Sequence, residues 1–420
     1  MELIEADEAM NARSQPATHA APEAAARPTL IASDGEAIAA ARQLAVEFAR
    51  TASARDAGRL LPWSELETYS ASGFWGVTVP RAYGGAEVST VTLARIIAII
   101  AAADGSLAQI PQNHFYALEV LRVGGSEEQK RFFFGRVLAG DRFGNALAEI
   151  GKRDFKRRTR LVRDGTSWYV RGEKFYCTGA IYAHWIPTLV VAEEGGEDVS
   201  YLAFIPRNAL GVTIIDDWDG FGQRVTGSGS VLFENVQVEP DWIVPFKASF
   251  DRATTIGPHA QIMHAAIDLG IGFGAFEETL RFVRERSRPW LDANVEKASD
   301  DPLLLHQIGH VRVRLRAAEA LVERAAASVD EAQQAPDEDS VARASIAVAK
   351  ARILTTKASL LAANKLFELS GTSSTQSEDN LDRYWRNART HTLHDPVRWK
   401  YQAVGNFHLN GKRPPRHGAI

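Results

Sequence analysis

The feature that most limits the fold is a block of strand-like sequence between two long helical regions. Residues 161–171 hold two strand-like runs around Asp164-Gly165, a dipeptide typical of a two-residue hairpin turn. Further runs of this kind follow at short intervals, at 186–192, 201–205, 212–215 and 230–238. Short strands at such spacing predict a small antiparallel barrel or sandwich, which we assign to residues 141–248.

Helical patterns fill the chain on both sides of this block. Upstream, we expect helices at about 36–52, 63–72, 91–103, 105–123 and 126–138, the last with Ser126 as its N-cap. Downstream, four helices with short connections suggest a bundle, at 257–287, 303–332, 337–370 and 380–395. Gly270, Gly272 and Gly274 follow no strand, so they indicate close helix packing rather than a dinucleotide-binding loop.

The predicted fold is therefore mainly α with a central β domain. Its parts are an N-terminal helical domain at 36–140, a middle β-barrel at 141–248 and a C-terminal four-helix bundle at 249–410. Residues 1–35, rich in Ala and Pro, are expected to form a disordered or extended arm, and 411–420 a surface tail. A cleft between a barrel and a bundle is a natural site for a flat cofactor.

Charge and cysteine content exclude several classes of partner. The net charge of −4 gives no reason to expect nucleic acid or an anionic membrane surface as a partner. No apolar run reaches membrane-spanning length, and the acidic N-terminus lacks the features of a signal peptide. Cys177 is the single cysteine, so no intramolecular disulfide can form. We expect a cytoplasmic protein.

The segment 383–396 carries the densest group of chemically active side chains. If it is helical, His391 and His394 lie three residues apart on one face, and Pro396 ends the helix. Imidazole titrates near neutral pH and can exchange protons with a reacting group. The alternative is a helix end whose basic side chains offset the helix dipole. Because no third convergent ligand is visible, we expect no metal site here.

Motifs spread along the chain resemble the acyl-CoA dehydrogenase superfamily from about residue 36 onward. The resemblance lies in the segments 79–85, 172–179 and 222–240, in that order and at similar spacing. Within the superfamily, 102–107, 217–218 and above all 385–396 resemble the reduced-flavin-dependent monooxygenase branch. That branch holds dibenzothiophene monooxygenase and the SfnB-type sulfur-acquisition oxidoreductases.

This resemblance implies a function and a set of partners. It implies reduced FMN as cofactor, O₂ and a small organosulfur compound as substrates, and a homotetramer. A separate NAD(P)H-dependent flavin reductase would supply the reduced FMN, which fits the lack of a nicotinamide fingerprint in this sequence.

Two departures from the dehydrogenases favour the monooxygenase branch. The position of their catalytic glutamate falls on Asp395, a shorter side chain followed by a proline. Their glycine-rich FAD turn corresponds to residues 370–374, where only Gly371 remains. The hydroxyls of Thr372, Ser373 and Ser374 could instead bind a terminal phosphate, which favours FMN, with FAD as the alternative.

The resemblance carries four residues into catalytic roles. His394 is the expected acid/base, and His391 a partner of the flavin or a support for His394. Asn145 would hydrogen-bond an oxygen of the substrate or of the oxidant, unless it is only an amide at a strand edge. His114, inside an apolar helix, is either a further site residue or a buried histidine with satisfied hydrogen bonds.

The expected cofactor contacts come from three places. Thr178 would offer its hydroxyl or backbone N–H to the flavin ring, and Trp218 would wall the pocket, although both fit ordinary strand and core positions. Arg288 from a neighbouring subunit would clamp the phosphate together with Gly371, Thr372, Ser373 and Ser374.

Two other functions remain open from the sequence. One is an acyl-CoA dehydrogenase-type oxidoreductase with tightly bound FAD. The other is a non-catalytic helical assembly protein that uses the same fold.

Overall fold

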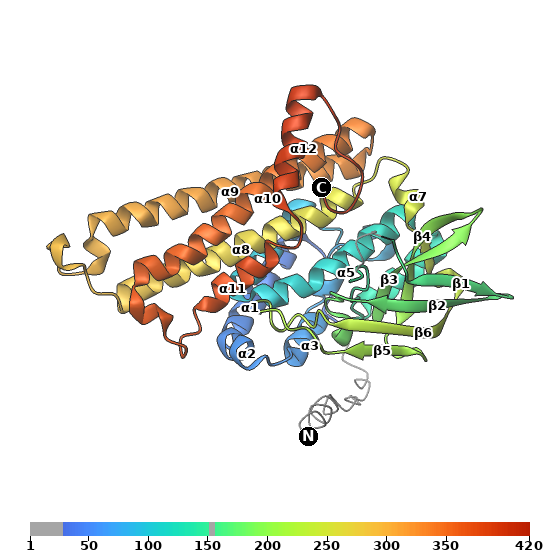
Figure 1. Ribbon diagram of the computed structural model, residues 1–420, viewed down its shortest axis with the longest axis horizontal. Coiled ribbons are helices and arrows are strands. Elements are labelled where there is room, and N and C mark those ends of the chain that lie inside the picture. Colours follow the sequence, from blue (N-terminus) through green and yellow to red (C-terminus); the bar gives the residue numbers. More distant parts are fainter. Residues whose placement is uncertain (1–27, 151–155) are drawn as a thin grey trace, which may run out of the picture.

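The structure is a computed structural model that describes residues 28–150 and 156–420. The arm was predicted over residues 1–35. Residues 1–27 lie outside the described residues, and helix α1 (Asp34–Ala49) already begins inside the predicted arm. Figure 1 shows a sheet at one end of the molecule and long helices at the other, with the N-terminal helices against both. No helix among the described residues has both the length and the apolar content needed to cross a membrane.

From residue 28 to residue 140 the described N-terminal region forms six α-helices, and five of them were predicted. They are α1 (Asp34–Ala49), α2 (Ala52–Gly58), α3 (Trp63–Ala71), α4 (Thr90–Ala103), α5 (Gly105–Gly124) and α6 (Glu127–Leu138). Ser126 caps α6 as predicted: its side chain accepts from the Gln129 backbone N–H, and the Gln129 side chain binds the Ser126 N–H in return. Helix α2 was missed, since its seven residues are too few to show a period.

The middle region is one seven-stranded sheet in the order β5-β6-β2-β1-β3-β4-β7. Its strands are β1 (Arg160–Asp164), β2 (Ser167–Lys174), β3 (Trp185–Glu194), β4 (Glu197–Pro206), β5 (Val212–Ile215), β6 (Ser230–Val238) and β7 (Ile243–Pro245). Asp164 pairs with Ser167, so the predicted hairpin is confirmed, with Gly165 and Thr166 as its turn residues in place of Asp164 and Gly165.

The predicted closed, antiparallel barrel is not found among the described residues. Among those residues the edge strands β5 and β7 pair only with β6 and β4 and not with each other, so the sheet is open. β1 and β3 run parallel, because the chain crosses from β2 over β1 before it forms β3 on the other side. Alternating sequence patterns identify strands, but they do not determine which strands pair or whether a sheet closes.

Five helices, where four had been predicted, follow the short helix α7 (Lys247–Phe250). They are α8 (Ile256–Glu285), α9 (Pro302–Gln334), α10 (Glu338–Ser370), α11 (Asp382–His391) and α12 (Val397–Asn410). The helix expected over 380–395 ends at His391, and Pro396 is the N-cap of α12. The proline was interpreted as a stop signal, whereas it also favours the first turn of a new helix.

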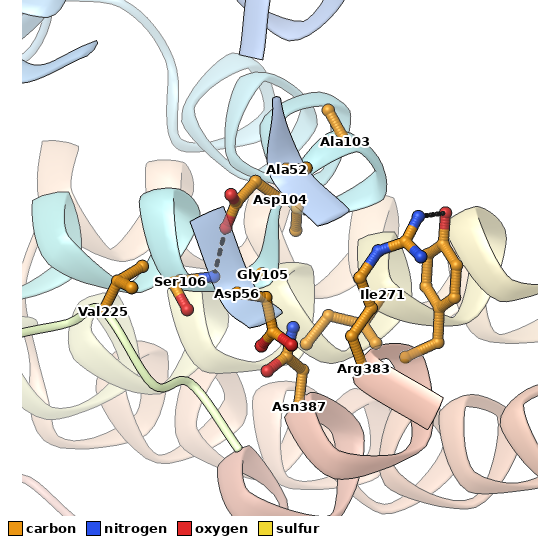
Figure 2. A pocket seen from close by; sticks show the side chains of 12 residues that line it. Ala52, Asp56, Ala103, Asp104, Gly105, Ser106, Val225, Ile271, Arg383 and Asn387 are labelled. Atoms are coloured by element: carbon orange, nitrogen blue, oxygen red, sulfur yellow. Dashed lines mark hydrogen bonds between the residues drawn. The ribbon is translucent and has the colours of Figure 1, made fainter. Parts of the chain in front are cut away.

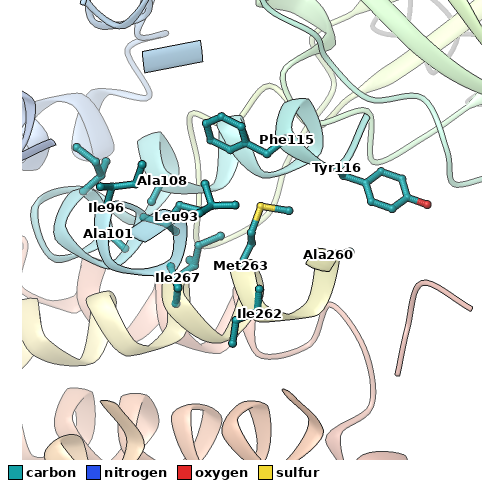
Figure 3. Packing of buried hydrophobic residues seen from close by; sticks show 14 of the residues in the cluster. Leu93, Ile96, Ala101, Ala108, Phe115, Tyr116, Ala260, Ile262, Met263 and Ile267 are labelled. Carbon is teal, nitrogen blue, oxygen red and sulfur yellow. The ribbon is translucent and has the colours of Figure 1, made fainter. Parts of the chain in front are cut away.

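The largest core cluster joins the N-terminal helices to α8. Figure 3 shows Leu93 and Ile96 of α4 and Phe115 of α5 facing Met263 and Ile267 of α8. These side chains are almost completely buried. A second cluster fills one face of the sheet, with Val170, Ile186 and Phe233 among its members.

The glycines of α8 allow close helix packing, as predicted. A Cβ on Gly270 would lie 2.3 Å from the Ala98 carbonyl oxygen of α4, and one on Gly274 would lie 2.4 Å from the Ala102 oxygen. α4 therefore rests directly on the backbone of α8.

We expect Gly270→Ala to lower the free energy of unfolding by about 1–3 kcal/mol, because overpacking against α4 outweighs the better helix propensity of alanine. Gly309→Ala is the matched control, since Gly309 lies in α9 with nothing within 4 Å of an added Cβ. That variant should be about 0.5–1 kcal/mol more stable than the parent. Chemical denaturation followed by circular dichroism measures both, and a stabilised Gly270→Ala would contradict the packing.

Candidate active site

A cavity of about 540 Å³ lies where the sheet domain meets the C-terminal helices. Its walls come from α5, the segment that follows α6, the loops that follow β2 and β5, and the end of α11 with the turn after it. Five of the predicted site residues line it: Asn145, Thr178, Trp218, His391 and His394. The volume is within the range of small-molecule sites, about 300–1,000 Å³.

A buried chain of hydrogen bonds runs from one wall of the cavity into the helices. The Asp268 carboxylate on α8 lies 2.5 Å from His391 Nδ1, and His391 Nε2 lies 3.1 Å from His264 Nδ1. A carboxylate accepts, so His391 carries its proton on Nδ1 and, when neutral, accepts from His264 through Nε2. Both ring nitrogens of His391 are therefore occupied.

Asp268 is held by more than the histidine. Its second oxygen accepts from the Arg352 guanidinium on α10 and from the Thr356 hydroxyl at 3.0 Å. Asp268 and Arg352 are almost fully buried, with side chains 0% and 1% exposed. A buried charge is tolerated only when it is paired, so this ion pair fixes how α8, α10 and α11 approach one another.

The two inner histidines are held in the neutral form. Burial lowers the pKa of His391, although the Asp268 carboxylate opposes that shift. Burial also lowers the pKa of His264 well below its usual value, and the neighbouring His394 and His391 rings and the Arg352 guanidinium lower it further. In a water-poor environment the charged imidazolium is the disfavoured form.

His394 lies outside α11, in the turn before α12, so the prediction that it shares a helix face with His391 is wrong. Its ring nevertheless packs against the ring of His264, with 4.0 Å between the centroids. His394 Nδ1 is 3.8 Å from Asp395 Oδ1, and its side chain is 45% exposed. Of the three clustered histidines, His394 is the most accessible.

Asp395 is held away from the cavity. Its Oδ1 accepts from Gln261 Nε2 at 3.0 Å, and its Oδ2 lies 3.3 Å from Lys400 Nζ. Burial works to raise the pKa of Asp395, but His394 and the positive charges of Arg352 and Lys400 together hold the pKa well below its usual range. The carboxylate is thus a fixed anion in an ion-pair network.

The opposite wall of the cavity is built from loops of the sheet domain. Asn145 Oδ1 accepts from the Leu147 N–H at 3.1 Å, and its Nδ2 donates to the Tyr176 carbonyl at 3.2 Å. Trp218 Nε1 donates to the Gln223 carbonyl at 2.9 Å, which holds the indole at the cavity edge. Thr178 lies in the loop after β2 rather than in the strand.

Two buried oxygens of the cavity lining have no hydrogen-bond partner among the described residues. They are Gln109 Oε1 on α5 and Thr390 Oγ1 on α11. Buried polar atoms in native proteins are nearly always satisfied. A flat heterocycle with N–H and C=O groups along its edges would supply the missing partners, and the aromatic side chains of Trp218 and Tyr176 suit its ring faces. The residues present therefore fit a flavin ring.

Helix α11 is anchored to the N-terminal helices at its other end. Figure 2 shows Asn387 and Asp56 lying close together, with Asp104 capping α5 through Ser106. Asn387 Oδ1 accepts from the Gln223 N–H at 2.6 Å, which ties α11 to the Trp218 loop. Arg386 pairs with Asp56 at 2.6 Å.

The other predicted residues lie outside this cavity. His114 is fully buried between the Trp75 carbonyl, 2.9 Å from Nε2, and the Phe143 N–H, 3.0 Å from Nδ1. Arg288 is exposed in the segment after α8. The turn with Gly371, Thr372, Ser373 and Ser374 follows α10, and the Ser287 hydroxyl lies 3.4 Å from the Ser370 carbonyl, so this turn and the Arg288 segment are neighbours.

Sequence reasoning missed His264, Asp268 and Arg352. The first two were detectable, because they are ionisable residues four apart in the otherwise apolar stretch 262–276 of α8, a spacing that puts them on one face. Gln109 and Ser228 gave no comparable signal, since single polar residues of this kind are common. Within the described residues, no group of three or more His, Cys, Asp or Glu side chains is arranged to hold a metal ion.

We expect Asp268→Asn to lower the free energy of unfolding by about 3–5 kcal/mol, because Arg352 would stay buried without its anionic partner. Thr356→Val is the matched control: it removes one neutral donor to the same carboxylate and should cost about 1 kcal/mol. Denaturant titration compares the two variants. Similar small losses in both would show that the ion pair does not hold the helices together.

The pKa of His114 is lowered from 6.5 to about 4, chiefly because burial disfavours the charged ring. The unfolded chain therefore binds a proton below about pH 6.5 that the folded chain rejects. The stability that this residue contributes is complete above that pH and falls by about 1.4 kcal/mol per pH unit down to about pH 4.

His114→Gln keeps a donor and an acceptor but does not titrate, so its melting temperature should fall less between pH 7 and pH 5 than that of the parent. His310→Gln, on the exposed face of α9, should keep the parental slope. Identical slopes in all three proteins would contradict the assignment of His114 as a neutral buried histidine.

Comparison with known proteins agrees with this geometry. Residues 36–141 match the family "Acyl-CoA dehydrogenase, N-terminal domain", and residues 262–399 match "Acyl-CoA dehydrogenase, C-terminal domain". The chain is 33% identical to dibenzothiophene monooxygenase of Rhodococcus erythropolis over 398 residues, which covers 91% of this chain and 95% of the relative. It is 32% identical to a probable FMNH2-dependent monooxygenase, SfnC, of Pseudomonas putida, covering 90% and 96%.

A solved structure extends the likeness to three dimensions. The FMN-bound TdsC of Paenibacillus sp. A11-2 superposes with a TM-score of 0.88 at 30% identity, covering 91% of this chain and all of that one. The chain therefore belongs to the acyl-CoA dehydrogenase superfamily, on the branch of flavin-dependent monooxygenases related to dibenzothiophene monooxygenase.

Proposed function

We propose that this protein is a two-component monooxygenase that uses reduced FMN and O₂ to oxygenate a small organosulfur compound in sulfur acquisition. The observation that carries the proposal is the cavity whose lining brings Trp218, Thr178 and Asn145 opposite His391 and His394. The curated relatives named above are monooxygenases, SfnC is described as FMNH2-dependent, and the TdsC structure contains bound FMN.

When bound in its reduced form, FMN supplies the electrons that activate O₂. Thr178 and Trp218 would hold the ring system. Arg288, Gly371, Thr372, Ser373 and Ser374 would hold the phosphate from a second copy of the chain, because in one chain they lie outside the cavity lining. Such a division of the site would require at least two copies of the chain, and it is compatible with the expected homotetramer. A separate NAD(P)H-dependent flavin reductase would supply the reduced FMN, and we expect the protein in the cytoplasm.

The histidines would divide the work of proton handling. The His394 ring lines the cavity, and its Nδ1 faces Asp395, so Nε2 is the nitrogen that would exchange a proton with a reacting group. Both nitrogens of His391 are already engaged, so it would orient its neighbours rather than react. The second N–H of the Asn145 amide would donate to an oxygen of the bound reactants.

The alternative, an FAD-dependent acyl-CoA dehydrogenase, is disfavoured by Asp395. Such an enzyme needs a carboxylate that faces the substrate and can accept a proton. Asp395 is instead 7% exposed, bound by Gln261 and Lys400, and outside the cavity lining. A dehydrogenase would also carry tightly bound FAD that bleaches anaerobically with an acyl-CoA.

Oxygen-18 labelling tests the proposed reaction. With a flavin reductase, NADH and FMN present, an organosulfur substrate should gain one labelled atom from ¹⁸O₂ and none from labelled water. Dibenzothiophene, small sulfides and sulfinates are suitable first compounds. Hydrogen peroxide as the sole oxygen product, with no label in any of these compounds, would refute the monooxygenase.

His394→Gln should lower kcat/KM by about 100-fold or more, the usual contribution of a general acid or base, with an unchanged dissociation constant for reduced FMN. His310→Gln, on the exposed face of α9 and outside the cavity lining, is the control and should keep full activity. If His394→Gln has the parental kcat/KM, His394 is not the acid or base, and another group must transfer the proton.

A further inference from the structure

Three buried hydroxyls form a single file behind the sheet-domain wall of the cavity. Thr178 Oγ1 lies 2.8 Å from Ser228 Oγ, and Ser228 Oγ lies 2.7 Å from Thr226 Oγ1. Thr226 Oγ1 lies 3.0 Å from the carbonyl oxygen of Gln223. Thr178 and Ser228 line the cavity, whereas Thr226 does not. The file therefore runs from the cavity to a backbone carbonyl.

The carbonyl at the far end sets the direction of every hydrogen in the file. A carbonyl oxygen can only accept, so Thr226 donates its single hydroxyl hydrogen to Gln223. Ser228 must then donate to Thr226, and Thr178 must donate to Ser228. The reverse direction would leave the Thr226 and Gln223 oxygens 3.0 Å apart with no hydrogen between them, a buried acceptor pair that costs free energy.

The Gln223 carbonyl is itself firmly held. It also accepts from the Trp218 indole N–H at 2.9 Å and the Thr226 backbone N–H at 3.3 Å, while the Gln223 N–H donates to Asn387. Within residues 28–150 and 156–420, the Thr178 hydroxyl forms a hydrogen bond with Ser228 and with no other group. Its hydrogen is thus used, and only its lone pairs remain for a ligand in the cavity.

This polarity distinguishes the two redox forms of a flavin. Two-electron reduction places a hydrogen on a ring nitrogen that is only an acceptor in the oxidised isoalloxazine. A hydroxyl oxygen that can only accept forms a hydrogen bond with the N–H of the reduced ring. In the oxidised ring the same nitrogen carries a lone pair and no hydrogen, so the two acceptors repel each other.

We propose that the hydroxyl file makes the cavity selective for reduced over oxidised FMN. Thr178 is the residue that contacts the ligand, and Ser228 and Thr226 are positioning residues that fix the direction of its hydrogen. This inference rests on the proposed flavin site and deepens it. A protein that receives reduced flavin from another enzyme gains from such selectivity, because the reduced form is retained and the spent form is released.

The test is to measure dissociation constants of the full-length protein for reduced FMN, under anaerobic conditions with dithionite, and for oxidised FMN. Ser228→Ala removes the acceptor of the Thr178 hydrogen, which becomes free to donate to the oxidised ring. We expect affinity for oxidised FMN to rise about threefold to tenfold, the effect of one net hydrogen bond, while affinity for reduced FMN falls.

Thr226→Val provides an independent route to the same result. It removes the acceptor of the Ser228 hydrogen, so Ser228 can turn and donate to Thr178, which reverses the file. Selectivity for reduced FMN should again drop about threefold to tenfold. Thr178→Ser keeps the hydroxyl and should keep the selectivity. Thr178→Val removes the hydroxyl and should weaken the binding of reduced FMN.

Thr188→Val is the matched control for loss of a buried threonine hydroxyl. Thr188 lies in β3, its hydroxyl bonds the Ile186 carbonyl, and it does not line the cavity. Both dissociation constants should stay at the parental values in this variant.

The possible outcomes distinguish a failure of the redox selectivity from a failure of the flavin site. If the parent protein binds reduced and oxidised FMN with equal affinity, the selectivity is refuted but the flavin site is not. The same holds if Ser228→Ala and Thr226→Val weaken the binding of both redox forms equally. If neither form of FMN binds the parent protein, the proposed function fails and the selectivity fails with it. If the ratio of the two dissociation constants falls or reverses in Ser228→Ala and Thr226→Val, both the flavin site and its selectivity are supported.

Discussion

The buried carboxylate of Asp268 is the constraint on which the active-site region depends. A charge in the apolar interior of α8 is unstable unless cations and hydrogen-bond donors reach it. Arg352 of α10, Thr356 of α10 and His391 of α11 all do so. Three helices that are distant in sequence must therefore meet in one register, and this register brings the end of α11 to the cavity.

A second ion pair continues this network to the C-terminus. Lys400 of α12 binds Gln261 and lies 3.3 Å from Asp395, and it also donates to the Ala419 carbonyl at 2.8 Å. The buried carboxylates of Asp268 and Asp395 are thus balanced by Arg352 and Lys400. This balance, together with burial, explains why His264 and His391 remain neutral and leave His394 as the accessible histidine.

The two walls of the cavity have different chemistry. The helical wall presents imidazoles that can hold or move a proton, whereas the sheet-domain wall presents hydroxyl and amide groups with fixed hydrogen directions. Helices α5 and α11 also contribute the buried oxygens of Gln109 and Thr390, which have no hydrogen-bond partner within the described residues. Such a site matches a planar ring system that changes its own hydrogen-bonding pattern when its redox state changes, which is the behaviour expected of a flavin.

The sequence by itself determined the order of helical and strand regions, the hairpin at Asp164-Gly165, the cap at Ser126 and the close packing at Gly270, because each depends on neighbouring residues or on a period. Motif resemblance also brought together five residues that line the cavity. Only the tertiary structure decided the open sheet, the break between His391 and α12, and the exclusion of Asp395 from the cavity. It alone revealed the roles of His264, Asp268 and Ser228, since those roles come from contacts between segments more than 40 residues apart, which no local pattern encodes.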